Sequence, residues 1–249
     1  MSNYYQNTPL GYEQDNLLTD TPVASKTFLA NVFLWMFVAL AISATTAFLF
    51  SSNMDAVAGY LASGGKILIY AIMFAPLAFV LVMNFAYHRL SMPVLALLFV
   101  AYSIINGISF SFLTLIYTSS SIVSCFAAAS GMFALMAIMG YKTKQDLTSF
   151  GRLMMMGLIG IVIASIVNWF MQSDAMGYII GIIGVAVFTG LTAYDVQKLK
   201  NIGNGIDANG NAMGIVDTKK YAIIGALSLY LDFVNLFLML LRVFGGKKN

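Results

Sequence analysis

Charged side chains, cysteine and histidine are all scarce in this chain of 249 residues. Charged residues make up 9% of the sequence, against about 25% in soluble domains. The single cysteine, Cys125, has no partner for an internal disulfide, so a disulfide scaffold is excluded. The single histidine, His88, lies beside Arg89 at the end of an apolar stretch. It leaves no evident base for a membrane serine protease and too few ligands for a metal hydrolase.

Several other enzyme and ligand-binding patterns are missing. The last apolar stretch has no central lysine for a retinal Schiff base, and the polar stretch 199–220 contains neither a phosphate loop nor an EF-hand loop. An intramembrane aspartyl protease would need two aspartates that share a proton, and Asp195 and Asp232 are the available pair. Asp232, however, lies in LYLDF rather than GxGD, and no Pro-Ala-Leu sequence follows. We expect neither enzymatic activity, nor a bound cofactor, nor a nucleic-acid partner.

Apolar residues, by contrast, are abundant. They make up 60% of the chain, and the mean hydropathy is +0.84. Each apolar stretch is close to the roughly 20 residues that a helix needs to cross a bilayer. The stretches cover residues 28–50, 67–87, 93–117, 120–139, 153–171, 177–197 and 221–244. The sequence therefore predicts an all-α membrane protein with seven transmembrane helices, embedded in a lipid bilayer.

The predicted organisation is a single membrane domain with short ends. Residues 1–26 form a polar N-terminal tail without the pattern of a cleavable signal peptide. Residues 27–245 form the seven-helix domain, and residues 246–249 form a basic C-terminal tail. Only Thr118 and Ser119 separate the third and fourth stretches at their tip, which predicts an antiparallel hairpin of neighbouring helices. The polar stretch 199–220 is interpreted as a flexible connector.

The distribution of lysine and arginine predicts the orientation. If the N-terminus is cytoplasmic, nine of the thirteen basic residues face the cytoplasm, which the positive-inside rule favours. These nine are Lys26, Arg89, Lys142, Lys144, Arg152, Lys198, Lys200, Lys219 and Lys220. Seven full crossings would place the basic C-terminal tail outside, so a re-entrant seventh segment is an alternative.

Small residues recur at helical spacing in three of the apolar stretches. Such faces allow close approach of helix backbones, which is the first interpretation, whereas a polar lining for a narrow pathway is the second. The positions are Ser103, Gly107, Ser111 and Thr114; Gly157, Gly160, Ala164 and Asn168; and Gly177 and Gly181.

The last apolar stretch carries the clearest polar stripe. Steps of three and four residues place its polar and small side chains on one helix face, while leucine and phenylalanine fill the remainder. A face this polar has to point inward, so the seventh helix is predicted to be central. The stripe consists of Tyr221, Gly225, Ser228, Asp232, Asn235, Met239 and Arg242.

Asp195 and Asp232 are the acids that lie inside long apolar segments. A carboxylate in hydrocarbon costs roughly 2.5 to 3.5 kcal/mol, so it needs an inward position, a partner or a role in an ion or proton path. If Lys198 and Lys220 mark one membrane surface, a rise of 1.5 Å per residue separates the two carboxyls in depth by about 13 Å. A pair sharing one proton is nevertheless favoured over two isolated acids. A structural aspartate is the alternative for each position.

Three segments resemble the Bax inhibitor family, whose members carry a transmembrane Bax inhibitor motif. They are GYKTKQDLTSFG (140–151), VFTGLTAYDVQKLK (187–200) and GALSLYLDFVNLFLMLLRVFG (225–245). The resemblance covers nearly the whole chain from Thr27 onward. It implies seven helices with a central last helix, and a pH-sensitive calcium leak. It also implies that Asp195 and Asp232 form a hydrogen-bonded sensor pair. We predict Tyr194, Ser228 and Asn235 as supporting residues of this pair. Some relatives place an arginine near this pair, for which Arg89 is the only substitute here.

Three functions follow as hypotheses. The first is a passive, proton-gated cation pathway in which Asp195 and Asp232 sense pH and bind calcium ions, since hard cations prefer carboxylate oxygens. The second is a proton-coupled cation exchanger. The third is a membrane regulator that acts through protein partners, in which the aspartates only fix helix packing. For all three, the sequence suggests a bacterial inner membrane with a cytoplasmic N-terminus.

Overall fold

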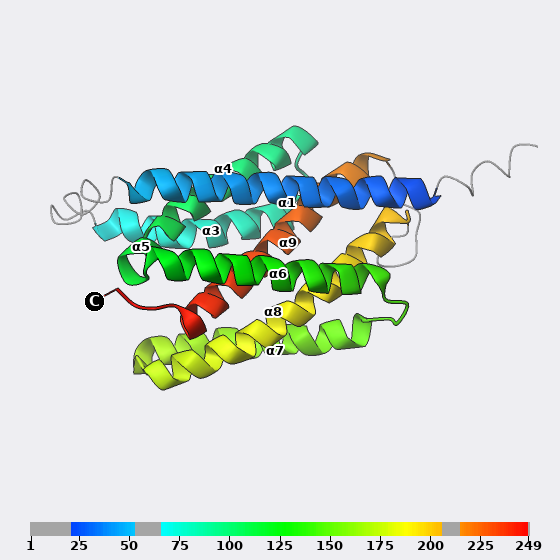
Figure 1. Ribbon diagram of the computed structural model, residues 1–249. Helices are drawn as coiled ribbons and strands as arrows, with labels where there is room; N and C mark the ends of the chain where they lie inside the picture. The colour runs from blue at the N-terminus through cyan, green and yellow to red at the C-terminus, as the bar shows by residue number, and fades with distance from the viewer. Residues whose placement is uncertain (1–20, 53–65, 206–214, 249) are drawn as a thin grey trace, which may run out of the picture.

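The chain folds into a bundle of long helices in the computed structural model, which describes residues 21–52, 66–205 and 215–248 (Figure 1). The N-terminal residues 1–20, and residues 206–214 of the predicted connector, lie outside the described residues. The helices are α1 (Thr21–Ser51), α3 (Lys66–Ala86), α4 (Met92–Ser111), α5 (Leu113–Ile116), α6 (Ser119–Lys142), α7 (Thr148–Met171), α8 (Asp174–Gly203) and α9 (Ile215–Phe244). α1 begins inside the segment predicted to be the polar tail.

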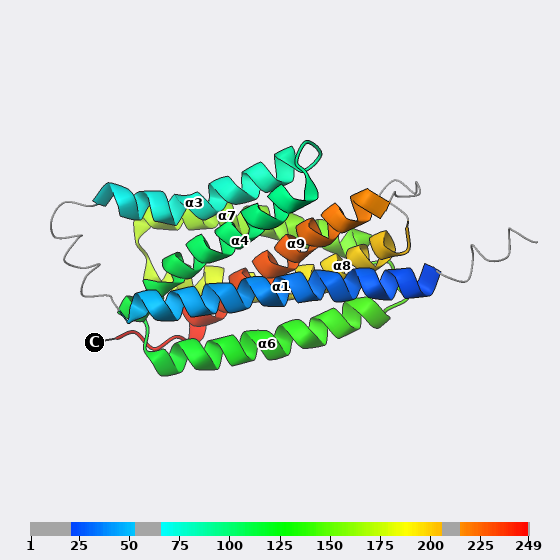
Figure 2. The ribbon, with the colours of Figure 1, turned by 90° about the horizontal axis from the view of Figure 1, so that it is seen from above.

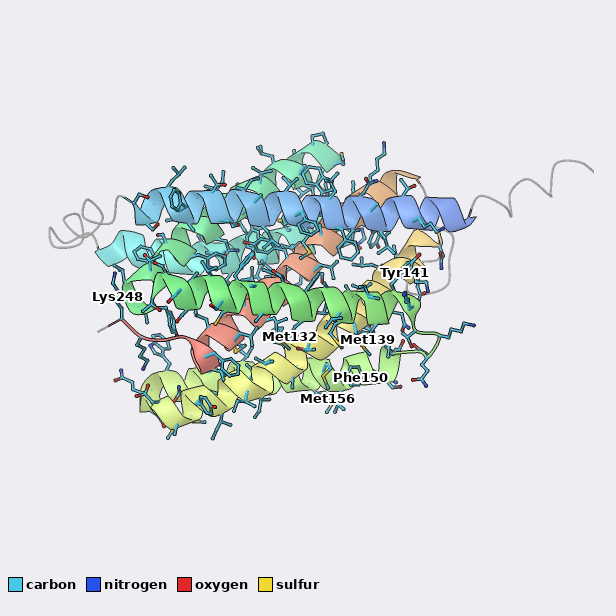
Figure 3. The ribbon with its side chains drawn as sticks, in the orientation of Figure 1. Met132, Met139, Tyr141, Phe150, Met156 and Lys248 are labelled. Carbon is cyan, nitrogen blue, oxygen red and sulfur yellow. The ribbon has the colours of Figure 1, made fainter. Side chains whose placement is uncertain are left out.

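Six helices of the described chain are long and apolar enough to cross a bilayer: α1, α4 together with α5, α6, α7, α8 and α9. α3 is also apolar, runs beside α4 and packs against it (Figure 2). The outer helices expose large apolar side chains, for example Phe85 and Phe170, and Met156 projects from the outer side of α7 (Figure 3). Contact of such side chains with lipid tails carries no hydrophobic cost, whereas contact with water does. The chain is therefore an integral, multi-pass membrane protein.

α9 lies at the centre of the bundle, the position that its polar stripe predicts. It packs against α1, α4, α6 and α8. In the most apolar segment of α9, 67% of the residues are buried, compared with 6% in the corresponding segment of the peripheral helix α7. α9 is a single unbroken helix of 30 residues, so the alternative of a re-entrant last segment is wrong. The start of α1 and the C-terminus consequently lie at opposite ends of the bundle (Figure 1).

The predicted hairpin of neighbouring third and fourth helices is also wrong. α4 packs against α1, α3 and α9, whereas α6 packs against α8 and α9. The connection is short and consists of α5 and the turn at Tyr117 and Thr118. Thr118 then caps α6, because its hydroxyl accepts a hydrogen bond from the Ser121 amide. A short connection therefore does not force its two helices into contact.

Candidate functional site: two carboxyls between α8 and α9

Glycines allow α8 and α9 to pack closely where their polar faces meet. A Cβ atom on Gly181 of α8 would lie 2.7 Å from Val243 Cγ2 of α9, and one on Gly184 would lie 2.6 Å from the Met239 side chain. On the α9 side, Gly225 packs directly against Leu199. These contacts are closer than a side chain permits, so the glycines set the separation of the two backbones. Gly160, by contrast, is exposed with open space around it.

Ser228 joins the two helices through a hydrogen bond to a carboxylate. Its Oγ donates to Asp195 Oδ2 at 2.9 Å. Ser228 lies one turn before Asp232 on the same face of α9. The sequence-predicted residues Asp195, Ser228 and Asp232 are therefore brought together at a single level of the bundle.

Asp232 is buried more completely than its partner. Only 7% of the residue is exposed, while Asp195 is partly exposed. Among the residues that the structure describes, Asp232 Oδ2 is the one buried side-chain oxygen or nitrogen without a hydrogen-bond partner. The Asp195 carboxyl is close enough to interact electrostatically with that of Asp232, and Lys198 interacts in the same way with Asp195. Native proteins rarely leave a buried polar atom unpaired, so the unpaired oxygen calls for an explanation.

The predicted depth difference of about 13 Å is wrong, because Lys198 and Lys220 do not mark one level. α8 continues past Lys198 to Gly203, and α9 begins before Lys220, at Ile215. The hydrogen bond between Asp195 and Ser228 sets the actual register. Lysine side chains extend along apolar surface to reach water, so their positions in the sequence define a membrane surface only loosely.

The other predicted residues lie around or apart from this centre. Asn235 is half-buried, one turn beyond Asp232 on α9. The ring of Tyr194 packs directly on Gly151 of α7 and so fastens α8 to its outer neighbour. Arg89 is exposed in the turn between α3 and α4, and no ion pair joins it to either aspartate in the described part of the chain. Arg89 therefore does not substitute for an arginine beside the pair.

Three side chains at this site carry oxygens of the kind that hard cations prefer. Calcium takes six to eight oxygen ligands, and the described residues contain no group of three or more histidines, cysteines or acids that could hold a metal. Two carboxyls and the Ser228 hydroxyl supply part of such a shell. The described oxygens at this site are therefore fewer than a calcium ion takes from its surroundings.

The residues that follow Asp195 fix the end of α8. Gln197 Oε1 accepts from the Leu147 amide at 2.8 Å, and Gln197 Nε2 donates to the Gln145 carbonyl at 2.8 Å. Lys200 donates to the Tyr141 carbonyl at 2.8 Å and lies over the Tyr141 ring, which Figure 3 labels at the end of α6. The motif that contains Asp195 is thereby attached to the loop between α6 and α7. Sequence analysis did not identify these contacts.

An acid outside the membrane-spanning helices provides a contrast. Asp146 Oδ1 accepts from the Thr148 hydroxyl at 2.6 Å and from the Thr148 amide at 2.9 Å, next to the start of α7. The hydroxyl donor, followed by the amide donor, holds the pKa of Asp146 below its usual range. Its carboxylate is exposed and accepts two hydrogen bonds through Oδ1, whereas Asp232 Oδ2 is buried without a partner.

A second polar cluster, which sequence analysis missed, lies on the opposite face of α9. Ser43 of α1 hydrogen-bonds to the Tyr230 hydroxyl at 2.8 Å and donates to the Ser103 carbonyl of α4 at 2.8 Å. Tyr102 packs edge-on against Tyr230 at 5.4 Å between ring centroids, and Asn106 lies beside both hydroxyls. Ser43 and Asn106, polar residues within apolar stretches, were the available signal. The cluster contains no group that is charged near neutral pH.

Comparisons with known proteins identify the family of the chain. The model of the family described as inhibitor of apoptosis-promoting Bax1 matches residues 25–249. Inner membrane protein YbhL of Escherichia coli is 44% identical over 223 residues, covering 90% of this chain and 93% of that protein. An uncharacterized protein of Deinococcus radiodurans is 38% identical over 219 residues, covering 88% and 90%. One of Borreliella burgdorferi is 37% identical over 222 residues, covering 89% and 93%. The chain belongs to the Bax inhibitor family.

Proposed function

We propose that the protein is a passive, pH-sensitive cation leak channel, with calcium as the transported ion. The observation that carries the proposal is the unpartnered Oδ2 of Asp232, buried beside a second carboxyl. Ionisable groups inside a bilayer are costly and are associated with ion or proton paths. Asp195 and Asp232 are the pH sensor and the transient ligands of the passing ion.

The pair controls the pathway through its charge. Two adjacent carboxyls in a poorly hydrated site cannot both ionise cheaply, so they share one proton over part of the pH range. The Ser228 hydroxyl donates to Asp195 Oδ2, and this hydrogen bond favours the ionised form of Asp195. Asp232 then carries the shared proton. Gaining or losing a proton changes the charge at the α8–α9 contact, which holds the centre of the bundle together. That change in charge is the gating event.

The protein lies in the bacterial inner membrane with its N-terminus in the cytoplasm. The printed name of YbhL supports the membrane, and the lysine and arginine count supports the orientation. The orientation is tested in a Cys125→Ala background with single cysteines at Ser2, Asn204 and Lys248. An impermeant thiol reagent applied to intact cells should label the cysteine at Lys248 and spare the other two. Rapid labelling at Ser2 and Asn204 would reverse the topology.

Calcium flux into liposomes that contain only the purified protein, across a pH series, tests the function. A leak dissipates any imposed calcium gradient, needs no proton gradient and changes its rate with pH. Strict countertransport of protons would instead identify an exchanger. Absence of flux at every pH, with the protein folded and correctly inserted, would leave the hypothesis of a regulator that acts through membrane protein partners.

A further inference from the structure

An apolar groove opens in the half of the bundle away from the start of α1. Its volume is about 540 Å³, and its walls come from α1, α4, α5, α6 and α9. It exists because α4 and α6 diverge, which leaves a space beside α9 that none of the described helices fills. Small-molecule sites usually have volumes of about 300 to 1,000 Å³, so the groove is large enough for a ligand.

The groove opens sideways between α1 and α6. Phe48 of α1 and Val123 of α6 both line it, and they are 70% and 69% exposed. In a multi-pass membrane protein, exposed apolar side chains at such positions face lipid tails. The groove is therefore accessible from the hydrocarbon of the bilayer.

The groove walls favour a hydrocarbon chain as the occupant. Phe233 and Phe237 form part of its floor. The hydroxyls of Ser51 and Thr114, at the edge of the groove, already donate to the carbonyls of Phe48 and Ser111 at 2.8 and 2.7 Å. The walls thus offer packing surface and little unused hydrogen-bonding capacity. Neither Asp195 nor Asp232 lines the groove, so it is separate from the carboxyl pair.

Backbone hydrogen bonds hold the segment that contains Lys248 near one end of the groove. The Lys248 amide donates to the Ile116 carbonyl of α5 at 2.8 Å, and the Thr118 amide donates to the Gly246 carbonyl at 3.0 Å. Lys247 pairs with Asp174 at 3.2 Å, whereas Lys248 has no ion pair among the described residues. Figure 3 places Lys248 at the end of the bundle where α6 begins. A positive charge on the segment that borders an apolar groove is complementary to an anionic headgroup on an acyl chain.

We propose that the groove binds one phospholipid, with an acyl chain between α1 and α6 and the headgroup phosphate beside Lys248. The acyl chain supplies most of the binding affinity, because each of its buried methylenes contributes about as much as in a lipid anchor. The phosphate supplies selectivity for an anionic lipid over a neutral one.

Native mass spectrometry of delipidated protein titrated with phosphatidylglycerol tests the proposal. The wild type should saturate at one tightly bound lipid. Diacylglycerol, which has the chains without phosphate, should bind more weakly, and glycerol phosphate, which has the phosphate without chains, should not bind measurably. Tight binding of glycerol phosphate alone would identify a simple anion site and overturn the proposal.

Two variants block the groove. Ala47→Trp fills it from α1, and Val123→Trp covers it from the exposed rim, where a large side chain should not disturb folding. Val162→Trp on the exposed face of α7 is the matched control. Displacing two methylenes of the chain should weaken binding about tenfold in each groove variant, with no change in the control. Wild-type affinity in a folded Val123→Trp protein would overturn the proposal.

Lys248→Ala tests the headgroup contact. The backbone hydrogen bonds of the tail do not depend on the side chain, so the fold should persist. Phosphatidylglycerol should bind about fivefold more weakly and diacylglycerol equally well. Lys144→Ala, exposed at the other end of the bundle, should change neither. Equal loss for both lipids in Lys248→Ala, or equal loss in Lys144→Ala, would contradict a phosphate bound at Lys248.

Discussion

The two faces of α9 carry polar clusters of opposite character. Tyr230 and Asp232 are two residues apart, so they project to nearly opposite sides of the helix. On one side, the Tyr230 hydroxyl pairs with Ser43, and all members of the cluster are neutral near pH 7. On the other, Asp232 is buried with an oxygen that lacks a partner, beside Asp195.

This contrast separates two uses of polarity inside a membrane protein. A neutral cluster with paired hydroxyls resembles ordinary helix packing, in which side-chain hydrogen bonds average about 0.6 kcal/mol. An incompletely paired acid costs stability and needs another reason to be present. If that reason is ion passage, substitutions on the Asp232 face should alter pH-dependent flux, and those on the Tyr230 face should alter stability alone.

Substitution of the carboxyl pair should have the largest effect on flux. Asp195→Asn or Asp232→Asn leaves one titrating group and an amide that can still form hydrogen bonds, so each variant should fold. Calcium flux into liposomes should lose most of its pH dependence in either variant. The double variant should add little, because coupled sites are non-additive. Preserved pH dependence in both folded single variants would favour a packing role for these aspartates.

Close packing of α8 on α9 should be the next most sensitive feature. Gly181→Leu should destabilise the protein by about 1 to 3 kcal/mol through overpacking, because a Cβ atom there would lie 2.7 Å from Val243 Cγ2. The melting temperature in detergent should fall accordingly. Gly160→Leu is the matched control, since it has open space around it. Equal melting temperatures for the Gly181→Leu and Gly160→Leu variants would indicate that Gly181 borders lipid.

The neutral cluster should contribute less. Tyr230→Phe removes one hydroxyl, while Ser43 can still donate to the carbonyls of Ala39 and Ser103. The expected loss is about 0.6 to 1.7 kcal/mol, in the range measured for membrane helices. The pH profile of calcium flux should keep its midpoint and shape. A shifted midpoint would mean that the two faces of α9 are coupled, and it would contradict the claim that the Tyr230 face affects stability alone.

The smallest effect on flux is expected from an acid outside the bundle. The Thr148 donors lower the pKa of Asp146. The contribution of Asp146 to folding stability is therefore fully present at pH values above the ordinary aspartate pKa. It is lost only as pH falls through the lower folded value. Between about pH 6 and 8 it stays charged. Asp146→Asn should therefore leave the pH profile of flux unchanged, and a flattened profile would place a pH sensor in the loop.

The sequence predicts the polar centre better than the surroundings of the bundle. The spacing of Ser228, Asp232 and Asn235 identifies one inward face of α9 because helical periodicity is a local property. The same residues could not fix the register against α8, which depends on how far each helix extends beyond the membrane. That register follows from contacts in three dimensions, such as the hydrogen bond between Asp195 and Ser228.

Glycine positions illustrate a second limit of sequence patterns. Gly181 and Gly160 occur in similar apolar surroundings, yet Gly181 is buried against α9 and Gly160 is exposed. Lipid tails and helix interfaces are both apolar, so hydrophobicity does not distinguish the two faces. The divergence of α4 from α6, and hence the groove, likewise depends on three-dimensional packing that a short connection does not encode.

Infrared titration of the protein in liposomes tests the central claim most directly, because it follows the protonated carboxyl C=O band of the pair itself. The difference between wild type and Asp195→Asn isolates the site from the other acids. We predict a carboxyl transition in two steps for the wild type, one of which coincides with the midpoint of calcium flux, and a single step in Asp195→Asn. A carboxyl signal that stays constant across the pH range in which flux changes would contradict gating by Asp195 and Asp232.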